Sequence, residues 1–191
     1  MAENETSLRH MVIDAAIQLE YRISLVISSL LDVPLEESTV LGNKSSSLTF
    51  KSKTELLTDI RALASKDVKL FLLFAAIRNQ FAHNIQANTM TDCCAFLDGT
   101  DKALLKAYPP RKELVDKEAQ LQAALVLLVM DLSKILDKTL KVIEHKNYVR
   151  GKSDANEAIV SSMKIILTNV DGGEELLLAI KEHAEELLKG G

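Results

Sequence analysis

The chain has 191 residues, of which 47% are hydrophobic, and this length is enough for one sizeable core. Aromatic residues make up only 4% and Trp is absent, whereas Leu, Ala, Lys and Glu are abundant, a composition typical of helices packed on helices. The net charge of −4 excludes attraction of nucleic acid by overall charge, so any contact with RNA or DNA would be local. We therefore expect an all-α fold.

The cysteines and the apolar runs indicate a compartment. Cys93 and Cys94 are adjacent, and neighbouring cysteines rarely form a disulfide. No spaced Cys or His pairs and no Gly-rich phosphate loop are visible, so the sequence predicts neither a metal site nor a cofactor. The N-terminal MAENETSLRH is unlike a secretory signal, and the runs LFLLFAAI and AALVLLVM are about half of the roughly 20 residues that a membrane span needs. We expect a cytoplasmic protein that does not contact a membrane.

The first half of the chain reads as three helices. Apolar residues at three- and four-residue steps predict a helix from about 7 to 31, entered through Thr6 or Ser7 and ended by Pro34. The segment LEESTVLGNKSSSLTF that follows is expected to be a long loop, and long loops in compact domains are often functional. The spacing then predicts helices over 52–64 and from Ser65 to about 84, the latter apolar on most sides and therefore central.

The second half is expected to contain one long helix and several short ones. Residues 91–107 suggest two short helices separated by an Asp-Gly-Thr turn and stopped by Pro109 and Pro110. The longest periodic segment runs from about 111 to 145, the segment NYVRGKSD is expected to break it, and short helices are predicted at roughly 155–169 and 174–188. We therefore predict an up-and-down helical bundle over 1–150 and a helical appendage over 151–191 that packs on the bundle or on a partner.

Three polar residues, Arg78, Asn79 and His83, interrupt the apolar segment AAIRNQFAHN at 75–84. On a helix, Asn79 and His83 are four residues apart and lie nearly on one face, and the long side chain of Arg78 can reach toward them. Histidine titrates near neutral pH, arginine offers a planar donor fork for phosphate, and an amide can orient either group. These groups can cleave RNA without a metal: His83 exchanges a proton with the 2′-hydroxyl or the leaving 5′-oxygen, and Arg78 stabilises charge on the phosphate.

Two lysines extend this candidate site. Lys51 and Lys53 lie at the start of the helix predicted over 52–64, in a mildly basic part of the chain, and could approach a phosphate beside Arg78. The alternative is that the same polar residues only hold the helix in place. In that interpretation Asn79 and His83 bond to backbone carbonyls of the loop at 43–50, and Arg78 pairs with an acid of the first helix such as Glu20.

The residues IRNQFAHN resemble the signature of the HEPN superfamily, the higher eukaryote and prokaryote nucleotide-binding helical domains. That signature is an Arg, a polar residue that is often Asn, and then a His, on the third of four or five bundled helices. The preceding LTFKSKTELLTDIRALASKD also resembles the corresponding segment of the mannitol-operon-repressor family and of neighbouring HEPN-like families. The resemblance follows the helix order over about 8–145, and its motifs are specific over 48–84.

This resemblance implies a homodimeric bundle in which the Arg and His of two subunits meet in a groove. Many HEPN proteins are metal-independent ribonucleases of bacterial or phage toxin–antitoxin, abortive-infection or CRISPR-associated defence systems. For this chain the resemblance implies that Arg78 stabilises the phosphate, that Asn79 is the orienting residue and that His83 transfers protons. Other members keep a similar signature without nuclease activity, so the resemblance also allows a non-enzymatic transcription regulator, or an antitoxin-type partner subunit that acts through protein contacts.

Overall fold

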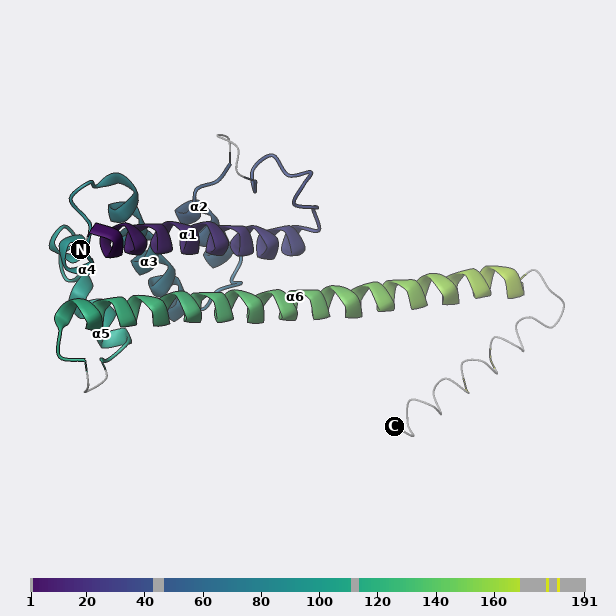
Figure 1. The fold of residues 1–191 in the computed structure, drawn as a ribbon. Coiled ribbons are helices and arrows are strands. Elements are labelled where there is room, and N and C mark those ends of the chain that lie inside the picture. Colours follow the sequence, from purple (N-terminus) through teal and green to yellow (C-terminus); the bar gives the residue numbers. More distant parts are fainter. Residues whose placement is uncertain (1, 43–46, 111–113, 169–177, 179–181, 183–191) are drawn as a thin grey trace. The chain divides into compact units, whose positions relative to one another are not determined.

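The computed structural model describes residues 2–42, 47–110 and 114–168, together with positions 178 and 182. Every regular element in this part of the chain is a helix (Figure 1), so the predicted all-α class is confirmed. The described helices are α1 (Ala2–Leu31), α2 (Phe50–Asp59), α3 (Ser65–His83), α4 (Met90–Ala95), α5 (Thr100–Ala107) and α6 (Lys117–Thr168).

The chain divides into two compact units, residues 1–143 and residues 144–191, where the sequence analysis puts the boundary at 150. The predicted helix break at NYVRGKSD is wrong, because α6 passes through this segment and ends at Thr168. A single Gly151 in a helix interior costs only about 1 kcal/mol relative to alanine, and the segment contains no proline. The helix predicted at 155–169 is therefore the end of α6, and the one predicted at 174–188 lies outside the described residues.

Three of the helices contribute one apolar face each to the core of the first unit. Buried positions on α1 and α6 recur at three- and four-residue steps, and α3 contributes large aromatic side chains. The ring centroid of Phe50, at the start of α2, lies 6.3 Å from the ring centroid of Phe71 and 5.9 Å from that of Phe74. The buried residues of these faces include Leu8, Val12, Leu19, Ile23 and Ile27 on α1, Phe71, Phe74, Ile77 and Phe81 on α3, and Leu121, Leu125, Leu128 and Leu132 on α6.

The helix ends follow from local chemistry. After α1, Asp32 adopts a left-handed conformation with φ of 54°, and the Val33 N–H donates to the Ser28 carbonyl at 3.2 Å, which closes the helix just before Pro34 as predicted. The predicted entry through Thr6 or Ser7 is wrong, since α1 begins at Ala2. The start of α2 at Phe50 is two residues earlier than predicted, because Thr49 caps it by accepting from the Ser52 N–H at 3.2 Å.

The apolar run of α6 is longer than the sequence analysis allowed. Within Lys117–Ser162 an 18-residue window has a mean hydropathy of 1.5, so by length and composition this is one described helix that could cross a membrane. About 33% of that window is buried inside the protein, and Leu121, Leu125 and Leu128 pack in the core. A core helix of a globular protein can have the same composition, so the hydropathy alone is weak support for a membrane span.

Candidate functional site

A cleft of about 320 Å³ lies between the start of α2 and the C-terminal half of α3. It contains four of the five residues that the sequence analysis singled out, Lys51, Arg78, Asn79 and His83. The structure therefore brings together residues that are up to 32 positions apart (83 − 51) in the sequence. The described residues that line it are Thr49, Phe50, Lys51, Phe74, Ala75, Arg78, Asn79 and His83.

Packing of α2 on α3 explains why these side chains meet. The hydroxyl of Thr49 fixes the first turn of α2, and the buried ring of Phe50 packs against Phe74. This contact places the residue after Phe50, the exposed Lys51, at the rim of the cleft. On the facing helix, Phe74 is buried while Ala75 and Arg78 turn toward the opening.

Arg78 and Asn79 form a direct pair at the rim. Nη1 of Arg78 donates to Oδ1 of Asn79 at 3.1 Å, so the guanidinium lies beside Asn79, within the reach expected from its long side chain. The bond uses the amide oxygen of Asn79 and leaves the amide nitrogen as a donor. His83, the last residue of α3, is exposed at the same cleft, and within the described part of the chain its imidazole forms no hydrogen bond.

Lys53 does not belong to this cleft. Its side chain is 0% exposed, and Nζ donates to Oε1 of Glu20 at 3.0 Å and to the Leu41 carbonyl at 3.1 Å. Residues two positions apart on a helix project about 200° apart around its axis. Since Lys51 faces the cleft, Lys53 points away from it and cannot contact a phosphate bound there.

The pairing of Lys53 also removes one alternative predicted for Arg78. Glu20 is the partner of Lys53, and Arg78 bonds to Asn79, so the predicted Arg78–Glu20 pair is absent from the described structure. Ser24 donates to the same Leu41 carbonyl at 2.9 Å. Within the described residues, the Leu41 carbonyl of the long loop is therefore held by the Lys53 ammonium and the Ser24 hydroxyl. The predicted bonds of Asn79 and His83 to carbonyls of the loop at 43–50 fall partly outside the described residues.

The charge in the cleft favours an anion. Its described lining includes the basic side chains of Lys51 and Arg78 and the imidazole of His83, but no Asp or Glu. Nζ of Lys51 lies 3.6 Å from Oε1 of Glu55, which is exposed. An exposed ion pair of this kind is weak, so Lys51 can leave it to bind a ligand. The first turn of α2 also points the positive end of its helix dipole toward this region.

A second arginine, Arg9 of α1, holds the end of α3 and was missed by sequence reasoning. Its guanidinium donates to the backbone carbonyl of Phe81, 72 positions away in the sequence, and to carbonyls of the segment after α3. No local pattern reports such a contact, because it depends on how α1 and α3 pack. The only hint is a cation in an otherwise apolar helix face, between Leu8 and Val12.

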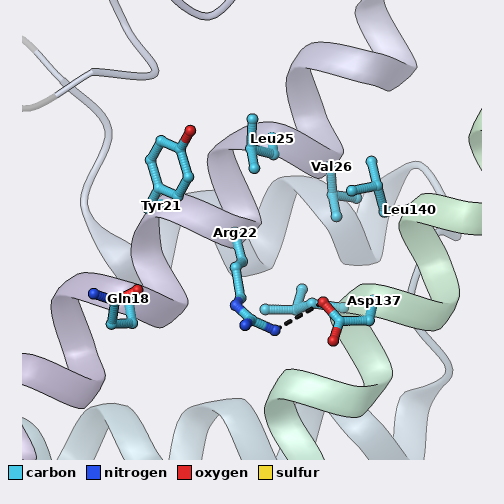
Figure 2. A pocket seen from close by; sticks show the side chains of 8 residues that line it. Gln18, Tyr21, Arg22, Leu25, Val26, Asp137 and Leu140 are labelled. Carbon is cyan, nitrogen blue, oxygen red and sulfur yellow. Dashed lines mark hydrogen bonds and ion pairs between the residues drawn. The ribbon is translucent and has the colours of Figure 1, made fainter.

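The two cysteines and a second cleft are weaker candidates for a functional site. Burial raises the pKa of Cys93 to about 12 and that of Cys94 to about 11, so neither thiol is an activated nucleophile. A second cleft of about 320 Å³ lies between α1 and the first part of α6, and Figure 2 shows its polar centre. There Nη1 of Arg22 and Oδ1 of Asp137 are 2.7 Å apart, so the arginine is already paired.

The comparisons with known proteins add no relative. No protein-family model, curated protein or solved structure shows a significant match to this chain. The functional argument therefore rests on the cleft formed by Lys51, Arg78, Asn79 and His83.

Proposed function

We propose that the cleft binds phosphate groups of RNA and that the protein is a HEPN-like, metal-independent endoribonuclease of bacterial or phage stress or defence type, acting in the cytoplasm as a homodimer. The observation that carries the proposal is the charge of the cleft. Arg78, Lys51 and His83 line it, and none of its described lining residues is a carboxylate, in a chain whose net charge is −4. A local cluster of cations in an acidic protein is what recognition of a phosphate backbone requires.

Each residue has a distinct role in the proposed reaction. The 2′-oxygen of the RNA attacks phosphorus and the bond from phosphorus to the 5′-oxygen breaks, which yields a 2′,3′-cyclic phosphate and a 5′-hydroxyl. His83 accepts the 2′-hydroxyl proton, and the second copy of His83 in the dimer donates a proton to the 5′-oxygen. Arg78 stabilises the charge that builds on the phosphate, Asn79 holds Arg78 through their 3.1 Å bond, and Lys51 binds the adjoining phosphate.

The exposed face of α3 supports the dimer. Leu72, Asn79 and His83 follow one another at steps of seven and four residues, so they lie along one face of the helix. All three are exposed, and Leu72 is 40% exposed although it is a large apolar residue. A second copy packed on this face would bring two His83 side chains into one groove, and the reaction above needs both.

A second candidate is a non-enzymatic regulator or antitoxin-type subunit that binds another protein. The observation that favours it is the surface of α6 in the second unit, where large apolar side chains are exposed. Tyr148 is 69% exposed and Ile159 is 54% exposed, and Val149 and Val160 are also exposed. Apolar side chains gathered on one exposed helix are typical of surfaces that contact a partner.

The test is RNA cleavage by the purified protein in excess EDTA, followed by analysis of the ends of the products. We expect fragments with 5′-hydroxyl and 2′,3′-cyclic phosphate ends. His83→Ala should lower the rate by at least about a hundredfold, as expected for loss of a general acid–base group. His145→Ala is the matched control, since His145 is exposed and does not line the cleft.

The two candidates predict different outcomes. Undiminished cleavage by His83→Ala would refute the assignment of the catalytic base. A wild-type protein that does not cleave RNA, but loses binding of a partner protein when Tyr148 and Ile159 are changed to Ser, would favour the regulator. Melting temperatures of all variants should be measured in parallel, so that loss of the fold is distinguished from loss of the reaction.

A further inference from the structure

Arg9 on α1 contacts the end of α3 through both terminal nitrogens of its guanidinium. Nη1 donates to the carbonyl of Phe81, and Nη2 lies 2.9 Å from the carbonyl oxygen of Ala87 and 3.2 Å from that of Asn84. Two further acceptors, the Ile85 carbonyl oxygen and Oδ1 of Asn88, lie 3.5 Å and 3.3 Å from Nη2. One side chain therefore joins the last turn of α3 to most of the segment that follows it.

The acceptors of Arg9 lie in the last turn of α3 and in the segment directly after it, and the Asn84 carbonyl also accepts from the Ala87 N–H at 3.2 Å. The last carbonyls of an α-helix have no intrahelical donor, and a cation at this end also matches the negative end of the helix dipole. The Asn84 N–H donates to the Gln80 carbonyl at 2.8 Å, and Oδ1 of Asn84 accepts from the Gln86 N–H at 3.0 Å. The turn is thus organised around Asn84, and the carbonyl of Asn84 is bonded to Arg9.

His83 lies between two of these anchored carbonyls. Phe81 lies two residues before it and Asn84 directly after it, and His83 is the last residue of α3, where helices normally fray. Its imidazole has no hydrogen bond within the described structure, so the backbone at the end of α3 sets the direction in which this side chain leaves the helix toward Arg78 and Lys51. Whatever fixes that backbone also fixes the geometry of the cleft.

We infer that Arg9 is a positioning residue for His83: its guanidinium holds the last turn of α3 closed, and this keeps the imidazole at the cleft. Arg9 is not among the residues that line the cleft, so its proposed role is to position His83 and not to bind the ligand. Its loss should therefore lower kcat and leave KM for RNA nearly unchanged. The effect on catalysis rests on the proposed ribonuclease function, whereas the hold on the backbone can be measured without any reaction.

The experiment compares Arg9→Lys with the wild type by amide hydrogen exchange. Lysine keeps the charge but loses the fork that reaches several carbonyls at once. Because bonds to a charged donor are among the stronger hydrogen bonds, we expect the Asn84 amide to exchange about tenfold to a hundredfold faster in Arg9→Lys. The matched control is Arg22→Lys, an arginine of the same helix that pairs with Asp137 at 2.7 Å (Figure 2) and should leave the Asn84 amide unchanged.

The second measurement is RNA cleavage by the same variants. We expect kcat of Arg9→Lys to fall about tenfold or more with KM within about twofold, because a small misplacement of a catalytic group is costly, and Arg22→Lys to behave as the wild type. Unchanged exchange at Asn84 in Arg9→Lys would overturn the inference whatever the activity. Faster exchange with an unchanged kcat would also overturn it, while leaving the ribonuclease proposal intact.

A third measurement decides the case in which the wild type does not cleave RNA and the proposed function fails. Inorganic phosphate is then added while the NMR signal of the His83 imidazole Cε1–H is followed. A phosphate-dependent shift in the wild type that is lost in Arg9→Lys would support positioning by Arg9 at an anion site without catalysis. A shift that is equal in both proteins, or absent from both, would overturn the inference.

Discussion

The buried ion pair of Lys53 and Glu20 offers the clearest prediction about stability. Lys53 is fully buried, and its ammonium bonds to Oε1 of Glu20 at 3.0 Å and to the Leu41 carbonyl at 3.1 Å. Lys53→Met keeps most of the apolar stem and removes only the charged donor. The matched control is Lys51→Met, because Lys51 lies two residues away on the same helix and its side chain is 68% exposed.

The loss of stability in Lys53→Met depends on whether Glu20 and the Leu41 carbonyl find other hydrogen-bond partners once the ammonium is removed. Two hydrogen bonds from a charged donor are worth about 3–6 kcal/mol together before the cost of burying the ammonium is subtracted. Glu20 is 24% exposed and can recover water, and the Leu41 carbonyl keeps the 2.9 Å bond from Ser24. We therefore expect Lys53→Met to lower the free energy of unfolding by about 2 kcal/mol, or Tm by roughly 4–8 °C, and Lys51→Met by less than about 0.5 kcal/mol.

Urea unfolding measures the energetic coupling between Lys53 and Glu20. The proteins compared are the single variants Lys53→Met, Lys51→Met and Glu20→Gln and the double variant Glu20→Gln/Lys53→Met. In the wild-type background Glu20→Gln should be destabilising, and in the Lys53→Met background it should cost almost nothing, a coupling of about 1 kcal/mol or more. The reasoning would be refuted if Lys53→Met were as stable as Lys51→Met, or if the two changes were additive.

Two further predictions concern Glu118 and the cysteines. Burial alone would raise the pKa of Glu118, but bonds from the Thr91 hydroxyl, from Gln122 and from the N–H groups of Met90 and Thr91 outweigh it and hold the pKa below the usual 4.5. The pKa of Glu118 is thus lower in the folded than in the unfolded protein. The stabilisation by its carboxylate is complete at pH values above the unfolded-state pKa, and it is lost as pH falls through the folded-state pKa. Urea unfolding should therefore show Glu118→Gln less stable than wild type at about pH 7, with a difference that shrinks toward about pH 3; a difference independent of pH would contradict this cause. For Cys93 and Cys94, burial raises the pKa to about 12 and about 11, so the folded protein should react with a thiol reagent much more slowly at about pH 8 than the urea-unfolded chain; equal rates would show that the thiols are accessible.

Sequence reasoning located the helices well where a local signal marks their ends. Pro34 follows the end of α1, Pro109 and Pro110 follow α5, and Ser65 begins α3 as predicted. It failed at residues 147–154, where polar residues and one glycine suggested a break. Helix propensities differ by less than about 1 kcal/mol for such residues, so they weaken a long helix without ending it.

The candidate site was predicted in the same uneven way. Arg78, Asn79 and His83 lie within six residues on one helix, and helical geometry alone brings them together. Lys51 and Lys53 were not distinguished, because the start of α2 had been placed two residues too late and the side of the helix that faces α3 was unknown. Arg9 and Glu20 find their partners across the fold, and contacts of that kind leave no pattern in the local sequence.

The order of the elements has a consequence for synthesis on the ribosome. The described groups that line the cleft or bond to the end of α3 come from residues 9–88, whereas Leu121, Leu125 and Leu128 of α6 are translated later. The nascent chain thus carries the complete cleft before it can cover its apolar core. During that interval the growing polypeptide exposes the apolar faces that α6 will bury, and transiently exposed surface of this kind is prone to aggregation.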